Sequence, residues 1–298
     1  DVNIDTSSRN KAAVSVTGSG NTTIKLDGDN ALKSDTYRSG IASTGSLTIS
    51  GGENDSLTAQ GGSGANGISS SGSLTISGGT VTATGGNSTG IVGYGGSGIY
   101  SSSGVAISGG AVTANGGDSK DGYGGNGIYS SSVAISGGTV KAAGGNGKDG
   151  YGGNGISSTS TTISGGTVTA NGGSGNSSGG NGIRSNGVAI SGGTVEAAGG
   201  VGKNGSGGSG IISNDIDLSG SLELTAKAGS PNGKALSRAG HEFDLDTIKD
   251  KLDPGAKVTT TDADGKVNQV SISRPVEPEK PVIPEESSSS SDGGSSAP

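Results

Sequence analysis

The chain has 298 residues, of which 65 are glycine, and its apolar and aromatic fractions are only 27% and 2%. This composition excludes an ordinary domain with a thick core, because too little apolar surface is present to offset the ordering entropy unless repeated units share one thin core. A net charge of −7 without a basic stripe argues against nucleic acid as a partner. The absence of cysteine excludes disulfides and zinc–thiolate sites, and no apolar run is long enough to insert into a membrane.

The first segment, residues 1–40, carries a weak alternation of apolar and polar positions. Val14 and Val16 form one such pair, and Ile24 and Leu26 form another. Alternation of this kind is typical of short strands. We therefore expect one irregular N-terminal capping coil that protects the first open sheet edge.

Residues 41–228 contain seven units, each opened by a Gly-Ile dipeptide. The isoleucines of successive dipeptides are 27 to 31 residues apart, and each is followed by a second and a third apolar anchor. The anchors of the seven units are Ile41, Ile49 and Leu57; Ile68, Ile76 and Val81; Ile99, Ile107 and Val112; Ile128, Ile135 and Val140; Ile156, Ile163 and Val168; Ile183, Ile190 and Val195; and Ile211, Leu218 and Leu224. A fixed period of about 28 residues indicates a solenoid.

Each unit contains three short extended pieces. Val81 and Ala83 in one such piece are two residues apart and so lie on one face. Ser-Gly-Gly follows the second piece, and its glycines permit the positive φ of a sharp corner. The pattern predicts an all-β, three-sided, right-handed parallel β-helix of about seven coils. Like residues then stack between coils and bond along the stack, as in an asparagine column and a serine column: Asn66, Asn126, Asn154 and Asn181; and Ser50, Ser77, Ser108, Ser136, Ser164, Ser191 and Ser219.

The repeat breaks down after residue 228. Apolar spacing from Phe243 to Leu252 predicts a short helical turn, and two alternating stretches around Asp262–Gly265 predict a hairpin, so residues 229–273 form a C-terminal cap. Residues 274–298 are rich in proline, glutamate and serine, which predicts a disordered linker. We expect this linker to lead to another domain or a wall anchor, as part of a longer surface protein.

Insertions collect at one corner, between the third piece and the next Gly-Ile dipeptide, as is typical of the binding side of a solenoid. Tyrosines occupy the same Gly-Tyr-Gly-Gly position in three successive loops, and two more follow Gly-Ile dipeptides nearby. These residues and the Lys-Asp pairs of the same loops are the candidate glycan-binding residues: Tyr94, Tyr100, Tyr123, Tyr129, Tyr151, Lys120, Asp121, Lys148 and Asp149. The competing interpretation is a tyrosine stack that only stiffens long loops.

Two other chemistries have weaker signals. Residues 144–152 fit a calcium-binding nonapeptide, but that motif works in tandem at nine-residue spacing; we expect no cofactor, and Asp118, Asp121 and Asp149 are the candidate ligands if calcium binds. A β-helix polysaccharide lyase or hydrolase needs converging carboxylates. His241 lies outside the coils and Glu196 is isolated, so we expect no catalytic residue.

The phrases Leu74–Ala83 (LTISGGTVTA) and Asn66–Ile68 (NGI) resemble repeats of clostridial extracellular proteins grouped as carbohydrate-binding-domain proteins. The resemblance covers roughly residues 40–228. It implies a right-handed β-helix, an outer-surface location and a glycan ligand; one secreted member of the group binds acidic plant-wall polysaccharide and calcium. We therefore expect a non-catalytic secreted or cell-surface bacterial protein that binds polysaccharide along one loop edge. The alternative is a structural stalk or adhesin spacer that presents another domain.

Overall fold

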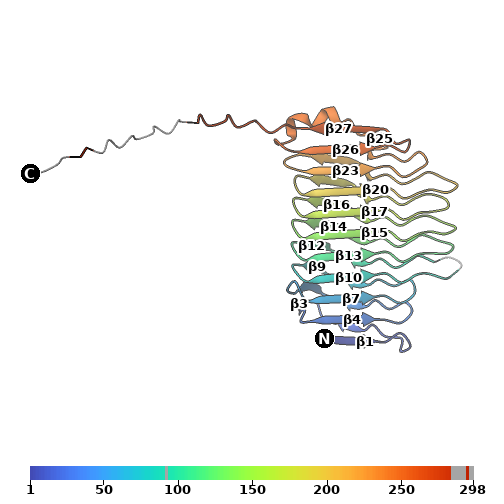
Figure 1. The fold of residues 1–298 in the computed structure, drawn as a ribbon. Helices are drawn as coiled ribbons and strands as arrows, with labels where there is room; N and C mark the ends of the chain where they lie inside the picture. Colours follow the sequence, from blue (N-terminus) through green and yellow to red (C-terminus); the bar gives the residue numbers. More distant parts are fainter. Residues whose placement is uncertain (91–92, 283–292, 295–298) are drawn as a thin grey trace, which may run out of the picture.

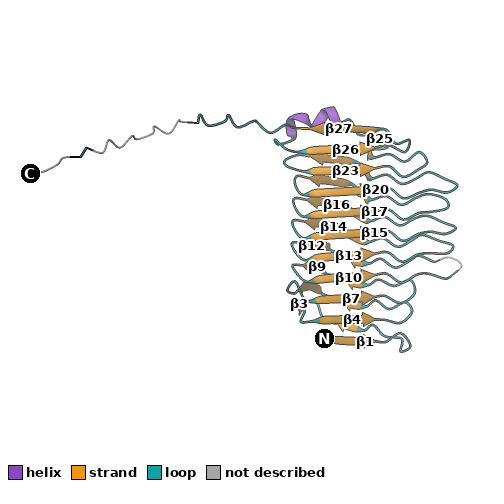
Figure 2. Ribbon diagram, in the orientation of Figure 1, coloured by secondary structure: helices purple, strands orange, loops and turns teal. Residues whose placement is uncertain are grey.

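The computed structural model describes residues 1–90, 93–282 and 293–294. Short strands recur in the same order once per coil and stack into a parallel β-helix (Figures 1 and 2). They form three columns that run along the helix axis, which we number in the order in which the chain visits them within a coil.

The first column begins each coil at the Gly-Ile isoleucine and contains β2 (Val14–Val16), β5 (Ile41–Ser43), β8 (Ile68–Ser70), β11 (Ile99–Ser101), β18 (Ile183–Arg184), β21 (Ile211–Ser213) and β24 (Leu236–Arg238). The second column contains β3 (Asn21–Lys25), β6 (Ser46–Ser50), β9 (Ser73–Ile76), β12 (Gly104–Ile107), β19 (Gly187–Ile190) and β22 (Asp215–Leu218). Two long strands run through both columns, β14 (Ile128–Ile135) and β16 (Ile156–Ile163). The third column contains β1 (Val2–Asp5), β4 (Asp29–Lys33), β7 (Ser56–Gln60), β10 (Thr80–Thr84), β13 (Ala111–Asn115), β15 (Thr139–Ala143), β17 (Thr167–Asn171), β20 (Thr194–Ala198), β23 (Glu223–Lys227) and β26 (Lys257–Thr261).

Neighbouring coils pair in parallel and in register, so that each anchor stacks on the same anchor of the next coil. The three columns do not form three separate sheets. Because β14 and β16 continue through the corner, the first and second columns merge into one 16-stranded sheet, and the third column forms an 11-stranded sheet. Ser131–Ser132 and Thr159–Ser160 keep the backbone extended there, whereas a glycine occupies this corner in four other coils: Gly45, Gly72, Gly104 and Gly187.

The core is the thin one that the period predicts. All 21 anchors of the seven units are buried, with exposed fractions of 0–2%. Because each coil presents only a few small aliphatic side chains inward, a coil is stable only when neighbours cover both of its open edges. The Ser-Gly-Gly corner is also confirmed: the second glycine adopts positive φ, for example +84° at Gly79 and +76° at Gly138.

Residues 1–40, expected as a capping coil, continue the same columns. β2, β3 and β4 pair with β5, β6 and β7, and β1 pairs with β4. Within the described residues the strands therefore complete eight coils, the seven of the repeat and this one.

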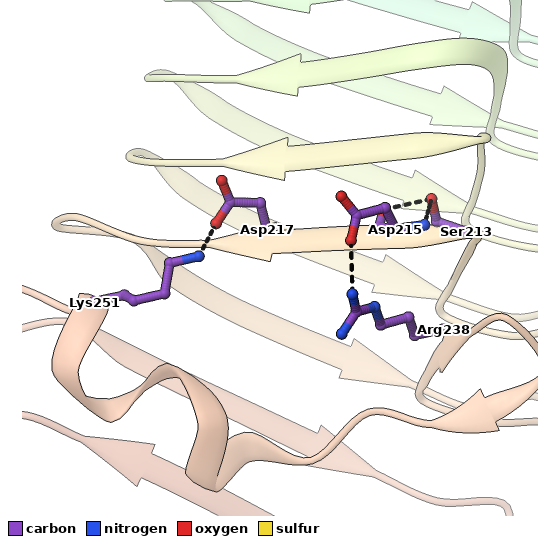
Figure 3. Close-up of polar contacts among 5 residues, drawn as sticks. All are labelled: Ser213, Asp215, Asp217, Arg238 and Lys251. Atoms are coloured by element: carbon purple, nitrogen blue, oxygen red, sulfur yellow. Dashed lines mark hydrogen bonds and ion pairs between the residues drawn. The ribbon is translucent and has the colours of Figure 1, made fainter.

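The C-terminal end is closed by a 3-10 helix and two antiparallel strand pairs. The helix η1 (Leu245–Lys251) is capped by the Asp244 side chain, and β27 (Val267–Ser271) forms a hairpin with β26. A shorter strand, β25 (His241–Glu242), pairs with β24. Ion pairs fasten this cap to the last coil (Figure 3): Arg238 contacts Asp215 at 3.0 Å, and Lys251 on η1 contacts Asp217.

The cap is followed by residues 274–282, which are exposed and have no regular structure, while 283–292 and 295–298 of the predicted linker lie outside the described residues. Among the described residues, no helix is long and apolar enough to cross a membrane.

Candidate functional site

Five long loops follow β10, β13, β15, β17 and β20 and stack on one another. We call them the loop wall: 85–98, 116–127, 144–155, 172–182 and 199–210, with residues 91–92 outside the described part. Each loop leaves its strand through two glycines and returns through two more, and the two limbs touch backbone to backbone. A Cβ added to Gly116 would lie 1.9 Å from the carbonyl oxygen of Gly125, and one added to Gly144 would lie 1.9 Å from that of Gly153. Only glycine permits this approach.

Backbone hydrogen bonds run back and forth along the loop wall. The Gly125 N–H donates to the Gly117 carbonyl in its own loop (2.7 Å), the Gly145 N–H donates to Gly125 in the preceding coil (2.8 Å), and the Gly153 N–H donates to Gly145 (2.8 Å). The same alternation recurs in the other loops of the wall. Loops are usually the most mobile part of a fold, but these are held in one continuous hydrogen-bonded layer.

Three tyrosines on the returning limbs form what we call the tyrosine stack. The ring centroids of Tyr94 and Tyr123 are 5.2 Å apart with planes 14° from parallel, and those of Tyr123 and Tyr151 are 4.7 Å apart at 10°. These distances match the separation of about 4.8 Å between adjacent strands of a sheet. Because the rings stack face to face, both faces of Tyr123 are covered, and its edge and hydroxyl remain accessible.

Two further tyrosines project from the outer face of the first column. Tyr100 on β11 and Tyr129 on β14 are partners in the parallel ladder. Their centroids lie 5.7 Å apart, and their planes are tilted by 51°. This tilt leaves part of each ring face open, and Tyr129 is 46% exposed.

Two members of the tyrosine stack and the first column line an elongated groove of about 810 Å³, which we call the tyrosine groove; Tyr151 is not among its lining residues. Tyr94 and Tyr123 line one side, and Tyr100 and Tyr129 line the other. The remaining lining is glycine with polar side chains and one charged residue: Ser97, Ser101, Ser102, Asn126, Ser130, Ser131, Asn154, Ser157, Ser158, Thr159 and Arg184. A groove that mixes aromatic rings with hydroxyl and amide groups is typical of a site for a polar ligand with apolar faces.

The asparagine column at the base of the groove is structural, as expected. The Asn126 Oδ1 accepts from the backbone N–H of Asn154 (3.0 Å) and from its Nδ2 (3.1 Å), and Asn154 accepts in the same way from Asn181. These bonds fix the level of each loop relative to the next. In the serine column, by contrast, the structure shows backbone bonds between coils, such as Ser108 N–H to the Ile76 carbonyl (3.0 Å), and the side chains lie at the surface.

The Lys-Asp pairs lie away from the groove. Lys120 and Lys148 line a separate hollow of about 260 Å³ beside the outgoing limbs, together with Asp118. Asp121 and Asp149, at the loop tips, are exposed and are not among the residues that line the tyrosine groove. The two lysines thus line a hollow that shares no lining residue with the tyrosine groove.

The carboxylate of Asp118 is already engaged. It accepts the backbone N–H of Asn146 (2.7 Å), while the Asp118 N–H donates to the Asn87 side chain (2.8 Å). This ladder continues the asparagine pattern at a second level of the loop. Within the described residues, no three carboxylate or histidine side chains come together as a metal site would require.

Two groups of groove residues were missed by the sequence reasoning. Arg184, which is not among the residues expected to bind a ligand, extends the row of Tyr100, Tyr129 and Ser157 on successive strands of the first column. The serines of the first-column corner also line the groove. A signal existed for both, because every residue directly after a Gly-Ile isoleucine must point outward on the same face.

Comparison with known proteins agrees with this fold. Residues 74–99, 162–182 and 188–210 match the model of the beta helix repeat family. No curated protein and no solved structure matches the chain. The matched segments fall on β9 to β11, on β16 and β17, and on β19 and β20. These parts of the chain are therefore similar to a β-helix repeat, and in the structure the same fold continues through the whole stack of coils.

Proposed function

We propose that this protein is a non-catalytic, secreted or cell-surface β-helix protein that binds a polysaccharide in the tyrosine groove. The observation that carries the proposal is the pairing of tilted Tyr100 and Tyr129 rings with the edges of Tyr94 and Tyr123 across one elongated, otherwise polar groove. The resemblance to clostridial surface repeats supports a glycan ligand and an extracellular location.

The two sides of the groove offer different chemistry to a sugar. The open ring faces of Tyr100 and Tyr129 suit the C–H face of a pyranose. The stacked rings offer edges and hydroxyl groups instead, because their faces cover one another. Serine hydroxyls and the Nδ2 group of Asn126 then add hydrogen bonds that orient the ring.

The lining residues support binding without catalysis. Glycoside hydrolysis requires two carboxyl groups that flank the scissile bond. The side chains that line the tyrosine groove are tyrosine, serine, threonine, asparagine and Arg184. His241 lies in the C-terminal cap on β25, far along the chain from the groove.

The groove is open and each contact is exposed, so affinity should be modest. We expect dissociation constants of about 0.01–1 mM, which correspond to roughly −4 to −7 kcal/mol. The rigidity of the loop wall helps, because the loops need not be ordered on binding.

A panel of soluble and insoluble polysaccharides tests the proposal, with retention in affinity gels as the readout. The parent protein should be retarded by at least one polysaccharide, and the Tyr100→Ala/Tyr129→Ala double variant should migrate normally at unchanged thermal stability. Failure of the parent to bind any glycan would favour the alternative function, a stalk or spacer. That function is supported by the way the tyrosine stack and glycine hydrogen bonds tie neighbouring loops together.

A further inference from the structure

Three hollows line up on the outer face of the first column. The tyrosine groove is the central one. A hollow of about 420 Å³ lies toward the N-terminal end and includes Ser15, Tyr37 and Ala42. Another of about 240 Å³ lies toward the C-terminal cap and shares Ser157, Ser158 and Arg184 with the central groove.

One straight row of side chains on the outer face of the first column passes through these hollows. Each member pairs with the next across adjacent parallel strands, so the row follows the helix axis. We call it the floor row: Ser15, Ala42, Ser69, Tyr100, Tyr129, Ser157, Arg184 and Ile212. Ser69 and Ser157 flank the two tyrosines, so a chain resting on those rings has room to continue over the next coil in either direction.

The spacing of the floor row selects a ligand geometry. Adjacent strands are about 4.8 Å apart, and the Tyr100 and Tyr129 ring centroids are 5.7 Å apart. A pyranose in an extended β-1,4-linked chain advances by nearly this distance, so such a chain can keep the same sugar position over each successive coil. An α-1,4-linked glucan coils and leaves a straight row after a few sugars.

We propose that the ligand is an extended β-1,4-linked polysaccharide that lies parallel to the helix axis with one sugar over each coil. This inference rests on the proposed function and adds the linkage, the direction and the length of the bound chain. Tyr100 and Tyr129 hold the central sugars. Tyr37, which is 79% exposed beside the N-terminal hollow, contacts only chains long enough to reach it.

Calorimetric titration with oligosaccharides of increasing length tests this geometry. The β-1,4 series are glucose, mannose, xylose and N-acetylglucosamine oligomers from dimer to hexamer, and the α-1,4 glucose series of equal lengths is the matched control. For at least one β-1,4 series, affinity should rise roughly tenfold or more from dimer to hexamer, while the α-1,4 series shows no such rise. Tyr37→Ala should weaken binding of the matching polymer and leave that of the tetramer unchanged.

The outcomes separate the two proposals. A dimer that binds as tightly as the hexamer, an α-1,4 hexamer that matches the β-1,4 one, or binding confined to glycans of other linkages would overturn the inference while glycan binding stands. An equal effect of Tyr37→Ala on tetramer and polymer would overturn the axial placement. Absence of binding to every glycan tested would overturn the proposed function itself.

Discussion

The substitution Gly145→Ala adds one methyl group to the loop wall. The new Cβ would lie 2.0 Å from the carbonyl oxygen and 2.5 Å from the carbonyl carbon of Gly117 in the preceding coil, so the two loops must separate. Separation breaks bonds between the two loops, namely the bond from the Gly145 N–H to the Gly125 carbonyl and the bond from the Gly124 N–H to the Tyr151 carbonyl, both 2.8 Å long. At a net value of about 0.5–1.5 kcal/mol for each bond, the free energy of unfolding should fall by about 1–3 kcal/mol.

The matched control is Gly187→Ala. No atom lies within 4 Å of the Cβ that this change would add, and the neighbouring coil has Ser160 at the paired position. Its effect on stability should stay within about 0.5 kcal/mol. Urea unfolding followed by far-UV circular dichroism measures both variants. If Gly145→Ala proves as stable as Gly187→Ala, the loop wall is not packed backbone to backbone and the reasoning fails.

Three other perturbations have clear expectations. Ile135→Asp places an unpaired charge in the thin core, should cost several kcal/mol and should destabilise neighbouring coils; unchanged β content and melting temperature would contradict the β-helix. The backbone N–H groups of Gly52 and Gly28 hold the pKa of Asp55 below its ordinary value. The stability contributed by Asp55 is therefore fully present above the unfolded pKa of about 4 and is lost as the pH falls further through the folded pKa. In Asp55→Asn this part of the acid destabilisation, followed by circular dichroism, should disappear; an identical acid profile would refute the assignment. Chelation with EDTA should leave the melting temperature unchanged, because the Asp118 carboxylate is satisfied by a backbone N–H; a large calcium-reversible shift would contradict this.

The coils could be predicted from the spacing of the apolar residues, because this spacing depends only on which side chains are buried. Each coil needs an apolar side chain that points into the core at the same position, and an isoleucine such as Ile128 or Ile156 recurs there. Both of these residues are fully buried. The corner between the first two columns was harder to predict. Ser131–Ser132 lacks a glycine, but sequence does not say whether a serine pair bends or continues a strand, and here it continues.

The candidate site could be predicted only in part. The spacing of Tyr123 and Tyr151 placed their rings one above the other, as the structure confirms. Lys148 is three residues from Tyr151, and this closeness suggested one common surface. The loop folds back on itself, however, so Lys148 lines a hollow that shares no residue with the tyrosine groove. Which limb faces which side depends on backbone pairing between coils, which residue spacing does not report.

Tyrosine fluorescence provides the most direct test of the glycan-binding groove. The chain has six tyrosines and no tryptophan, and four of the tyrosines line the groove, so a bound glycan should change the emission directly. Titration with the polysaccharide retained in affinity gels should give a saturable change in the parent and in Lys148→Ala, whose side chain lines a separate hollow. In Tyr129→Ala the apparent affinity should fall roughly tenfold at unchanged melting temperature. Equal affinity of Tyr129→Ala and the parent, or a loss of affinity in Lys148→Ala alone, would contradict a binding site in the tyrosine groove.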